Sequence, residues 1–362
     1  MTDQSANVLT VPVTVDLRRV EVIAPNFKQR LSGVTSTIVQ LVPLLSGRIG
    51  IATLGPGLPD TLPKLRWTQL PGLWRRPTGG VNRVWHARRN VEMLGGLALK
   101  GLGAPLTLVF TSASQRRHTS WTKFLIRRMD AVVATSAKTA AYLEVPNTVI
   151  MHGIDTSRFA PASAKAAAAA AVGLDASQSY VGCFGRVRRQ KGTDLFVNTM
   201  IELLPTRPGW SAIIAGRATA EHKAFEAGLK QKVRDAGLET RILFVGEHTD
   251  IERWYQALSL FVAPQRWEGF GLTPLEAMAC GVPVVATDVG AFSELLAQDT
   301  GRLIAADDGG AMIQAVADYM TDPQLLARSG ENATAHVRQN FPLDREADQL
   351  LEIYRRVLGS SA

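Results

Sequence analysis

Two glutamates flank a glycine-rich loop in the segment Arg266–Gly281, which reads Arg-Trp-Glu-Gly-Phe-Gly-Leu-Thr-Pro-Leu-Glu-Ala-Met-Ala-Cys-Gly. An apolar run that predicts a strand precedes the loop, and a pattern that predicts a helix follows it. Thr273, Pro274 and Glu276 fit the N-cap, N1 and N3 positions of a capping box. The bare glycine backbone before them would leave the helix N-terminus open to an anion such as a diphosphate. On the local pattern alone, Glu276 is explained equally well as a simple helix cap.

A second glycine-flanked loop, Gly185–Gly192, is strongly basic and follows another predicted strand. A loop of this kind at a strand end suits a phosphate group. Fixed cations in such a loop would stabilise the charge that develops when a nucleoside diphosphate leaves. Arg188 and Arg189 fit better as a solvated surface.

A third loop of small residues, Arg30–Thr35, follows the first predicted strand of the chain. Gly33 and Val34 would present backbone N–H groups at the start of a helix. The loop is not a G-x-G-x-x-G sequence, and no such triplet follows the first strand of either half. This weakens the interpretation as a nicotinamide-dependent dehydrogenase.

Charge is divided unevenly along the 362 residues, of which 46% are hydrophobic and 20% charged. Residues 1–160 hold 20 Lys and Arg against 8 Asp and Glu, a net charge of +12, and the remainder holds 20 against 24, a net charge of −4. The basic half predicts an anionic partner, which could be a nucleic acid, a membrane surface or an acidic substrate. Arginines interleaved with Trp121 and Phe124 suit an anionic lipid or a saccharide lipid. A solvated face above core aromatics is the plainer alternative.

The two cysteines, Cys183 and Cys280, lie in apolar stretches and are expected to be buried, reduced thiols. No apolar run approaches the roughly 20 residues that a membrane-spanning helix needs. Residues Met1–Thr10 lack the pattern of a signal peptide. We therefore expect a cytoplasmic protein, at the inner face of the cytoplasmic membrane if its acceptor is a lipid.

Short apolar runs alternate with helical patterns, which is typical of parallel α/β architecture. The strands expected in the first half are Val20–Ala24, Gly50–Leu54, Thr107–Phe110, Ala131–Ala134 and Thr148–Met151. Those of the second half are Tyr180–Phe184, Ala212–Ala215, Ile242–Val245, Leu260–Ala263, Val284–Ala286 and Leu303–Ile304. Helices are expected between them, such as Ala87–Lys100 and Asp194–Leu204. Residues 1–160 and 179–340 then form two Rossmann-like domains, residues 161–178 a linker, and residues 341–362 a helix that returns to the first domain.

The paired glutamates Glu268 and Glu276, with Gly-Phe-Gly-Leu between them, resemble the motif of the group 1 retaining glycosyltransferases (family four). The resemblance implies the GT-B fold, in which two Rossmann-like domains face each other across a cleft. It also implies that Glu268 binds hydroxyls of the transferred sugar and that Glu276 binds the ribose of the nucleotide. One carboxylate can accept two neighbouring hydroxyl donors. Arg186 and Lys191 match the positions that grip the diphosphate.

The residues expected at the donor follow from this resemblance: Gly33, Arg186, Lys191, Glu268, Gly269, Phe270, Gly271, Leu272, Thr273 and Glu276. Arg186, Lys191 and Glu268 are the expected catalytic residues. The sequence contains no Asp-x-Asp pair suited to a metal-bound diphosphate, so neither metal nor cofactor is expected. Many relatives place a histidine after the fourth strand, but Val109–Ser114 has none. The candidates for the acceptor site are therefore His86, Arg88, Arg89, Ser112 and His118.

Across essentially its whole length the chain resembles the mannosyltransferases of lipopolysaccharide core synthesis in rhizobia and their relatives. The segments that carry this likeness are Val22–Lys28, Arg83–Met93 and Ile126–Ala131. It implies transfer of mannose from GDP-mannose to a Kdo residue of the inner core, an anionic glycolipid. The closest alternative is the same fold with a UDP-sugar donor, UDP-glucose or UDP-N-acetylglucosamine. A basic nucleic-acid-binding protein is a more distant alternative, which no recognition motif supports and which leaves the paired glutamates unexplained.

Overall fold

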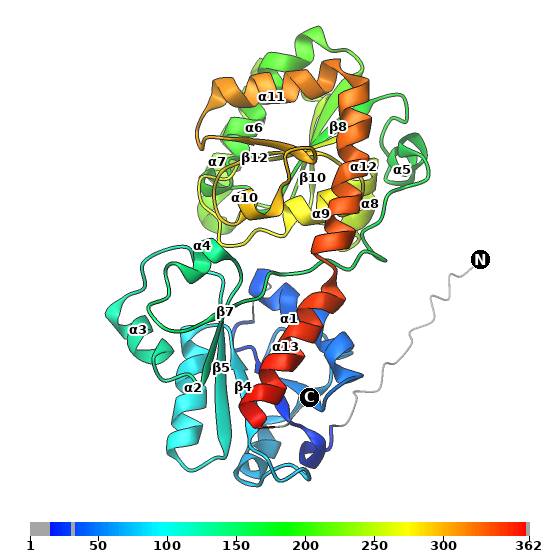
Figure 1. Ribbon diagram of the computed structural model, residues 1–362. Helices are drawn as coiled ribbons and strands as arrows, with labels where there is room; N and C mark the ends of the chain where they lie inside the picture. The colour runs from blue at the N-terminus through cyan, green and yellow to red at the C-terminus, as the bar shows by residue number, and fades with distance from the viewer. Residues whose placement is uncertain (1–14, 30–32, 360–362) are drawn as a thin grey trace, which may run out of the picture. The chain divides into compact units, whose positions relative to one another are not determined.

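The computed structural model describes residues 15–29 and 33–359 and divides into two compact units. Unit 1 contains the chain up to Thr135, residues Thr139–Met151 and the chain from Asp344 onward. Unit 2 contains Ser136–Lys138 and His152–Leu343. Figure 1 shows each unit as a sheet with helices packed around it.

Unit 1 is built on a parallel sheet with the strand order β3-β2-β1-β4-β5-β6-β7. The strands are β1 (Val22–Pro25), β2 (Ile51–Leu54), β3 (Lys64–Leu65), β4 (Arg83–Ala87), β5 (Leu106–Ser112), β6 (Ala131–Ala134) and β7 (Thr148–Val149). Its helices include α1 (Gly33–Ser46), α2 (Asn90–Gly101), α3 (Ser120–Ile126) and nearly all of α13 (Leu343–Leu358), with the short 3-10 helices η1 (Leu17–Arg19) and η2 (Trp67–Trp74). The central strands are buried along their length, as parallel strands covered by helices must be.

Strand β4 was missed in the sequence analysis, where Ala87 was expected to begin a helix. The strand pairs with β5 over five residues, and α2 begins only at Asn90. Arg83 and His86 interrupt its apolar pattern, although both side chains are almost completely buried. The Arg83 guanidinium donates to the backbone carbonyls of Val20 and Leu17, each at 3.0 Å, so its polar atoms are satisfied inside the core.

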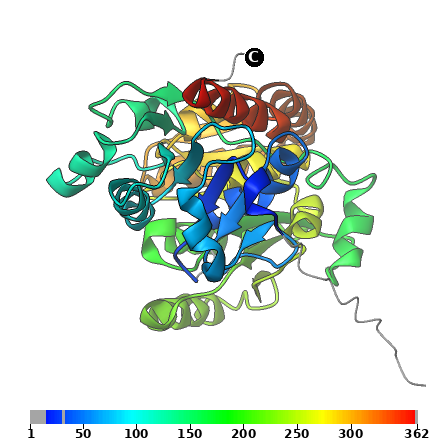
Figure 2. The same cartoon turned by 90° about the horizontal axis from the view of Figure 1, so that it is seen from below.

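Helix α13 belongs to unit 1 although it follows the whole of unit 2 in the sequence. The Tyr354 hydroxyl lies 2.6 Å from Nδ1 of His86, and Arg48 forms ion pairs with Asp344 and Asp348. In Figures 1 and 2 this helix, coloured red, runs along one side of the unit. The core of unit 1 is therefore closed by the last residues that the structure describes.

Unit 2 repeats the same architecture with the strand order β10-β9-β8-β11-β12-β13. The strands are β8 (Ser179–Phe184), β9 (Trp210–Ala215), β10 (Ile242–Gly246), β11 (Leu260–Ala263), β12 (Val284–Thr287) and β13 (Gly301–Ile304). Its helices include α5 (Lys165–Ala171), α6 (Thr193–Leu203), α7 (Lys223–Asp235), α8 (Ile251–Ala257), α9 (Thr273–Ala279), α10 (Phe292–Leu295), α11 (Gly309–Thr321) and α12 (Pro323–Asn340). Both sheets reverse their strand order at the first strand, as doubly wound nucleotide-binding sheets do. The expected fold class is confirmed.

Residues 161–178, for which a linker was expected, contain α5 and lie inside the long segment of unit 2, His152–Leu343. The Ala-rich stretch is helical because alanine has the highest helix propensity. Cys183 and Cys280 are buried, and burial raises the pKa of each thiol to about 12. In the described part of the chain, no helix is both long and apolar enough to cross a bilayer.

Candidate active site

The basic loop of unit 2 is fixed by glycines that allow a very close approach of the backbone. It follows β8 and ends in a short 3-10 helix, Arg189–Lys191. Gly192 has a φ of +70°, and a Cβ there would lie 1.8 Å from the carbonyl oxygen of Pro264 at the end of β11. Only glycine tolerates both conditions. Lys191 is thereby held beside the segment that carries the paired glutamates.

The ammonium of Lys191 forms an ion pair with the carboxylate of Glu268. Only 21% of the Lys191 side chain and 17% of the Glu268 side chain are exposed, so water screens the pair less than it would at the surface. The other carboxylate oxygen accepts a hydrogen bond from the backbone N–H of Gly269, at 3.1 Å. Two residues predicted to be catalytic are therefore in contact.

Small residues pack closely around Glu268. Gly271 has a φ of +87°, and a Cβ there would lie 2.4 Å from the ring of Phe292 and 2.9 Å from Cγ of Glu268. A Cβ at Gly290 would lie 3.0 Å from Cβ of Glu268. Phe270 is buried, with its ring edge-on to His152 at 4.8 Å between centroids. The loop from Gly269 to Leu272 thus holds the carboxylate in one position.

Glu276 does not cap helix α9, so the expected capping box is wrong. The N-cap is Leu272, which places Thr273 at N1 and Glu276 one position too far into the helix for a capping box. The backbone N–H of Glu276 donates to the Leu272 carbonyl, at 3.0 Å. The carboxylate instead accepts a hydrogen bond from the Tyr255 hydroxyl of α8, at 2.8 Å. Burial raises the pKa of Glu276, and the hydrogen bond from Tyr255 opposes that rise.

Arg266, for which the sequence pattern predicts no role, organises this region. Its guanidinium donates to both carboxylate oxygens of Asp194, at 2.7 and 3.0 Å, and its backbone N–H donates to Gln190 O at 2.9 Å. Asp194 lies in the first turn of α6, two residues after Gly192. A bidentate contact of this kind fixes orientation as well as distance. Arg266 thereby joins the basic loop to the glutamate loop.

In unit 1 the candidate residues cluster at the carboxyl end of β4. His86 is 1% exposed, and its two ring nitrogens lie 2.6 Å from Tyr354 Oη and 2.7 Å from Thr111 Oγ1. Burial and the nearby Arg88 lower the pKa of His86 well below its usual value, so the ring is neutral near pH 7. His86 therefore links α13 to the sheet of unit 1 through its hydrogen bond with Tyr354.

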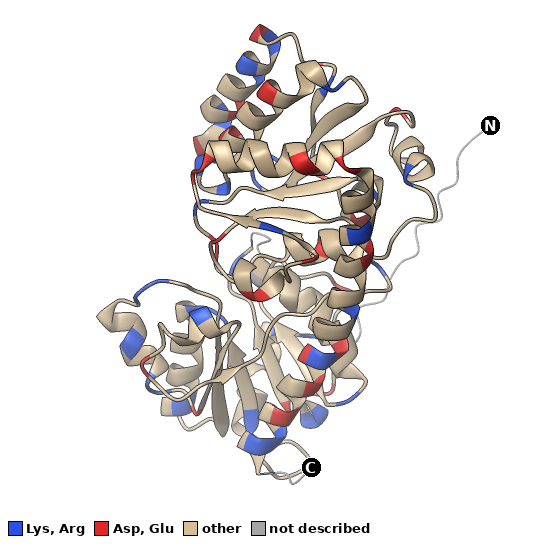
Figure 3. Ribbon diagram, turned by 45° about the horizontal axis from the view of Figure 1, so that its top comes forward, with Lys and Arg blue, Asp and Glu red and all other residues tan. Residues whose placement is uncertain are grey.

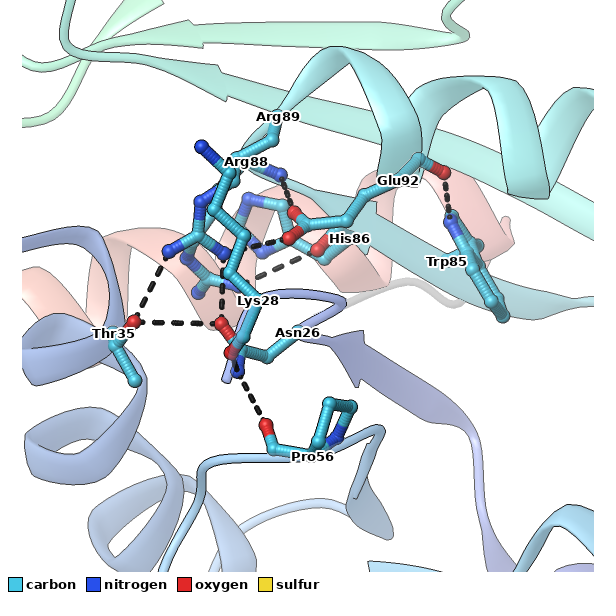
Figure 4. A network of polar contacts seen from close by, with 9 residues as sticks. All are labelled: Asn26, Lys28, Thr35, Pro56, Trp85, His86, Arg88, Arg89 and Glu92. Atoms are coloured by element: carbon cyan, nitrogen blue, oxygen red, sulfur yellow. Dashed lines mark hydrogen bonds and ion pairs between the residues drawn. The ribbon is translucent and has the colours of Figure 1, made fainter. Parts of the chain in front are cut away.

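Arg88 and Arg89 surround the carboxylate of Glu92, which is completely buried (Figure 4). The backbone N–H of Arg88 donates to Glu92 at 2.8 Å, and the Arg89 guanidinium pairs with it at 2.7 Å. Arg89 also donates to Asn26 at 2.7 Å and to Thr35 at 3.0 Å. Arg89 therefore links the loops that follow β1 and β4 through its hydrogen bonds and its ion pair.

The remaining candidates are dispersed. Ser112 is buried at the end of β5, and His118 lies after it in a small hollow with Lys123 and Glu144. Burial and the neighbouring cations lower the pKa of His118. Gly33 is the exposed first residue of α1, whereas Arg30, Leu31 and Ser32 of the same loop lie outside the described residues.

The chain has close relatives among proteins of known type. The family model "Glycosyl transferases group 1" matches residues 178–322, which lie within unit 2. The lipopolysaccharide core biosynthesis mannosyltransferase LpsB of Rhizobium meliloti is 63% identical over 95% of this chain and 99% of its own. The corresponding enzyme LpcC of Rhizobium leguminosarum bv. viciae is 58% identical over 96% and 99%. Among solved structures, Anabaena HepE in complex with UDP superimposes with a TM-score of 0.80 at 20% identity, covering 93% of this chain and 100% of that one.

Proposed function

This chain belongs to the group 1 glycosyltransferases, and we propose that it transfers mannose from GDP-mannose to a Kdo residue of the lipopolysaccharide inner core, with retention of anomeric configuration. The choice of sugar and pathway is supported by the two rhizobial relatives, whose names describe lipopolysaccharide core mannosyltransferases. GDP-mannose and Kdo are the donor and acceptor implied by the resemblance of the sequence to that group. The observation that carries the proposal is the contact between Lys191 and Glu268 in unit 2, together with the hydrogen bond that the Glu276 carboxylate accepts from Tyr255.

Each of these groups has a distinct role in the proposed reaction. The ammonium of Lys191 and the guanidinium of Arg186 bind the diphosphate and stabilise its charge as it leaves. The carboxylate of Glu268 accepts hydrogen bonds from hydroxyls of the transferred sugar, and that of Glu276 accepts them from the ribose. An acceptor hydroxyl oxygen bonds to the anomeric carbon on the face from which the nucleoside diphosphate departs. The proton of that hydroxyl passes to an oxygen of the departing phosphate, so no protein nucleophile is needed.

The basic charge of unit 1 supports an anionic, membrane-associated acceptor. On α3, the exposed rings of Trp121 and Phe124 stack at 5.4 Å, and the Arg128 guanidinium lies 3.5 Å from the centre of the Phe124 ring. Figure 3 shows Lys and Arg, in blue, on α3 and its surroundings. Exposed aromatics beside arginines suit the headgroup region of an anionic membrane. In the proposal this face rests on the inner surface of the cytoplasmic membrane.

The direct test is transfer of radiolabelled sugar by the purified full-length chain onto Kdo–lipid A, with GDP-mannose, UDP-glucose and UDP-N-acetylglucosamine as alternative donors. We expect incorporation from GDP-mannose alone, with an α-mannosyl product by NMR and protection against thermal unfolding by GDP. Incorporation from a UDP-sugar would replace the proposed donor. A β-linked product would contradict retention, and stabilisation only by an oligonucleotide would contradict the proposal as a whole.

The pH dependence of donor use tests the role of Glu276. Its pKa is raised, so its carboxylate becomes protonated, and loses its ability to accept from both ribose hydroxyls, at a higher pH than an ordinary glutamate. Donor kcat/KM should therefore be full above that pKa and fall as the pH falls through it. Tyr255→Phe removes a hydrogen bond that lowers this pKa, so the acid limb should move to higher pH. In Glu276→Gln the limb should vanish from the profile of log(kcat/KM) against pH; an unchanged limb would assign it to another group.

A further inference from the structure

A cavity of about 470 Å³ opens on unit 1, and its lining includes none of the site residues expected from the sequence. Its wall contains Gly55, which follows β2, and Arg66 and Trp67, which follow β3. Parallel α/β sheets bind their ligands at the carboxyl ends of the strands, and this cavity lies at two of those ends. The group 1 family model does not extend to these residues, which precede its first matched position.

The cavity wall is held in place by the network of Figure 4. Gly55 has a φ of +117°, and a Cβ there would lie 2.1 Å from the carbonyl oxygen of Asn26, so the loops after β1 and β2 touch. The Asn26 amide donates to Pro56 O at 2.7 Å, and its side-chain oxygen accepts from Arg89. Because Arg89 is anchored on the buried Glu92, the chain of contacts runs from the core to the cavity. The site is pre-formed, as small-molecule sites generally are.

Trp67 supplies a flat apolar surface at this cavity. Its side chain is 56% exposed, and its ring lies 6.2 Å from that of Phe27, between centroids. Tryptophan is usually well buried, so one that lines a cavity and faces water suggests a ligand. An indole face packs well against the C–H face of a pyranose ring. This geometry favours a saccharide over a flexible lipid chain.

Charge at the cavity is positive on balance. Lys64 Nζ donates to Asp60 at 3.2 Å and to the Leu58 carbonyl at 3.4 Å, so these two lining side chains neutralise each other. The exposed Arg66 carries the remaining positive charge. Gln69 accepts from the Arg66 backbone N–H at 2.9 Å and donates to Val15 O at 3.1 Å, which fixes the backbone that carries Arg66. A guanidinium in this setting suits a carboxylate.

We infer that this cavity binds a carboxylated sugar of the acceptor, with its ring stacked on Trp67 and its carboxylate paired with Arg66. The inference deepens the proposed function, on which it rests for the class of acceptor, and assigns acceptor recognition to residues remote in sequence from the family motif. The sugar bound in this cavity contributes binding affinity and orients the acceptor molecule. The hydroxyl that reacts lies on that acceptor.

Binding is tested by saturation-transfer NMR with a soluble Kdo disaccharide and its carboxyl-reduced counterpart, using the full-length chain. We expect signal transfer to the Kdo disaccharide in the wild type, loss of it in Trp67→Ala, and retention of it in Trp74→Ala. Trp74 is the matched control, because it ends the same 3-10 helix and is 42% exposed but does not line the cavity. Arg66→Gln should weaken binding of the carboxylated disaccharide about fivefold and leave the reduced one unchanged.

Kinetics separate this inference from the proposed function. With deacylated acceptor, Trp67→Ala should raise the acceptor KM about tenfold while the KM for GDP-mannose stays unchanged. If the wild type transfers mannose and Trp67→Ala leaves both the acceptor KM and the NMR signal unchanged, the inference that the cavity binds the acceptor sugar is wrong. The proposed function is then unaffected. Absence of any transfer by the wild type would contradict the proposed function. The NMR comparison would still test whether the cavity binds the sugar. If each variant unfolds at a temperature close to that of the wild type, misfolding is excluded as the cause of the change.

Discussion

Replacing Lys191 with alanine is expected to lower kcat for sugar transfer by about 100-fold or more. Lys191 is the cation in contact with Glu268, and in the proposed reaction it stabilises the leaving diphosphate in a partly desolvated site. A charged contact made in the transition state contributes several kcal/mol, which corresponds to at least two orders of magnitude in rate. The variant also leaves the Glu268 carboxylate without its ion-pair partner. Steady-state kinetics with saturating donor and acceptor measure the effect.

The matched control is Arg189→Ala, two positions earlier in the same loop. Its side chain is exposed, and the contact it makes to Arg266 uses its backbone carbonyl, which alanine retains. We expect this variant to keep a rate within about threefold of the wild type, since exposed charges contribute little. Equal losses in the two variants would show that general positive charge, and not the position of Lys191, is what the site requires.

Replacing Gly192 with alanine is expected to lower the free energy of unfolding of unit 2 by at least about 3 kcal/mol. The new Cβ would lie 1.8 Å from the Pro264 carbonyl oxygen, so the loop or the end of β11 must move. Either shift separates Lys191 from Glu268, and we expect transfer activity to fall with stability. Urea denaturation followed by the circular dichroism of the full-length chain, with the transition midpoints compared, measures the loss.

Gly173→Ala provides the comparison for this variant. Gly173 has a φ of +76°, close to the +70° of Gly192, but a Cβ there would meet nothing within 4 Å. Its cost should therefore be only that of a left-handed backbone, about 1 kcal/mol. If the two variants lose the same stability, the left-handed backbone conformation, and not the contact with Pro264, explains the loss in Gly192→Ala.

The fold could be predicted from the sequence wherever a strand was a continuous apolar run. Ala131–Ala134 and Leu260–Ala263 match the structure residue for residue, because both are buried strands free of charged side chains. Strand β4 could not be found in the same way, since Arg83 and His86 are satisfied by partners distant in sequence. The two-residue strand β3 is too short to produce a pattern.

The residues of the candidate site could be predicted where they form a local sequence motif. The residues that position this motif from distant parts of the chain could not be predicted. The spacing of Glu268 and Glu276 is visible in the sequence, and so are the glycines around them. The partners that position these side chains are not: Tyr255 lies 21 residues before Glu276, and Asp194 lies 72 residues before Arg266. A single sequence holds no record of which distant side chains meet. The capping box was wrong for a related reason, because a Thr-Pro-x-Glu pattern does not reveal that the helix begins one residue earlier.

Helix α13 has a consequence for how the protein is made. The sheet of unit 1 is synthesised first, but His86 and Arg48 find their partners on α13, which follows unit 2 in the sequence. All of unit 2 must therefore emerge from the ribosome before unit 1 can acquire its final contacts. Unit 1, whose synthesis begins before that of unit 2, therefore completes its folding only after unit 2 has been synthesised. A nascent chain stalled before Leu343 would lack the helix that supplies the partners of His86 and Arg48.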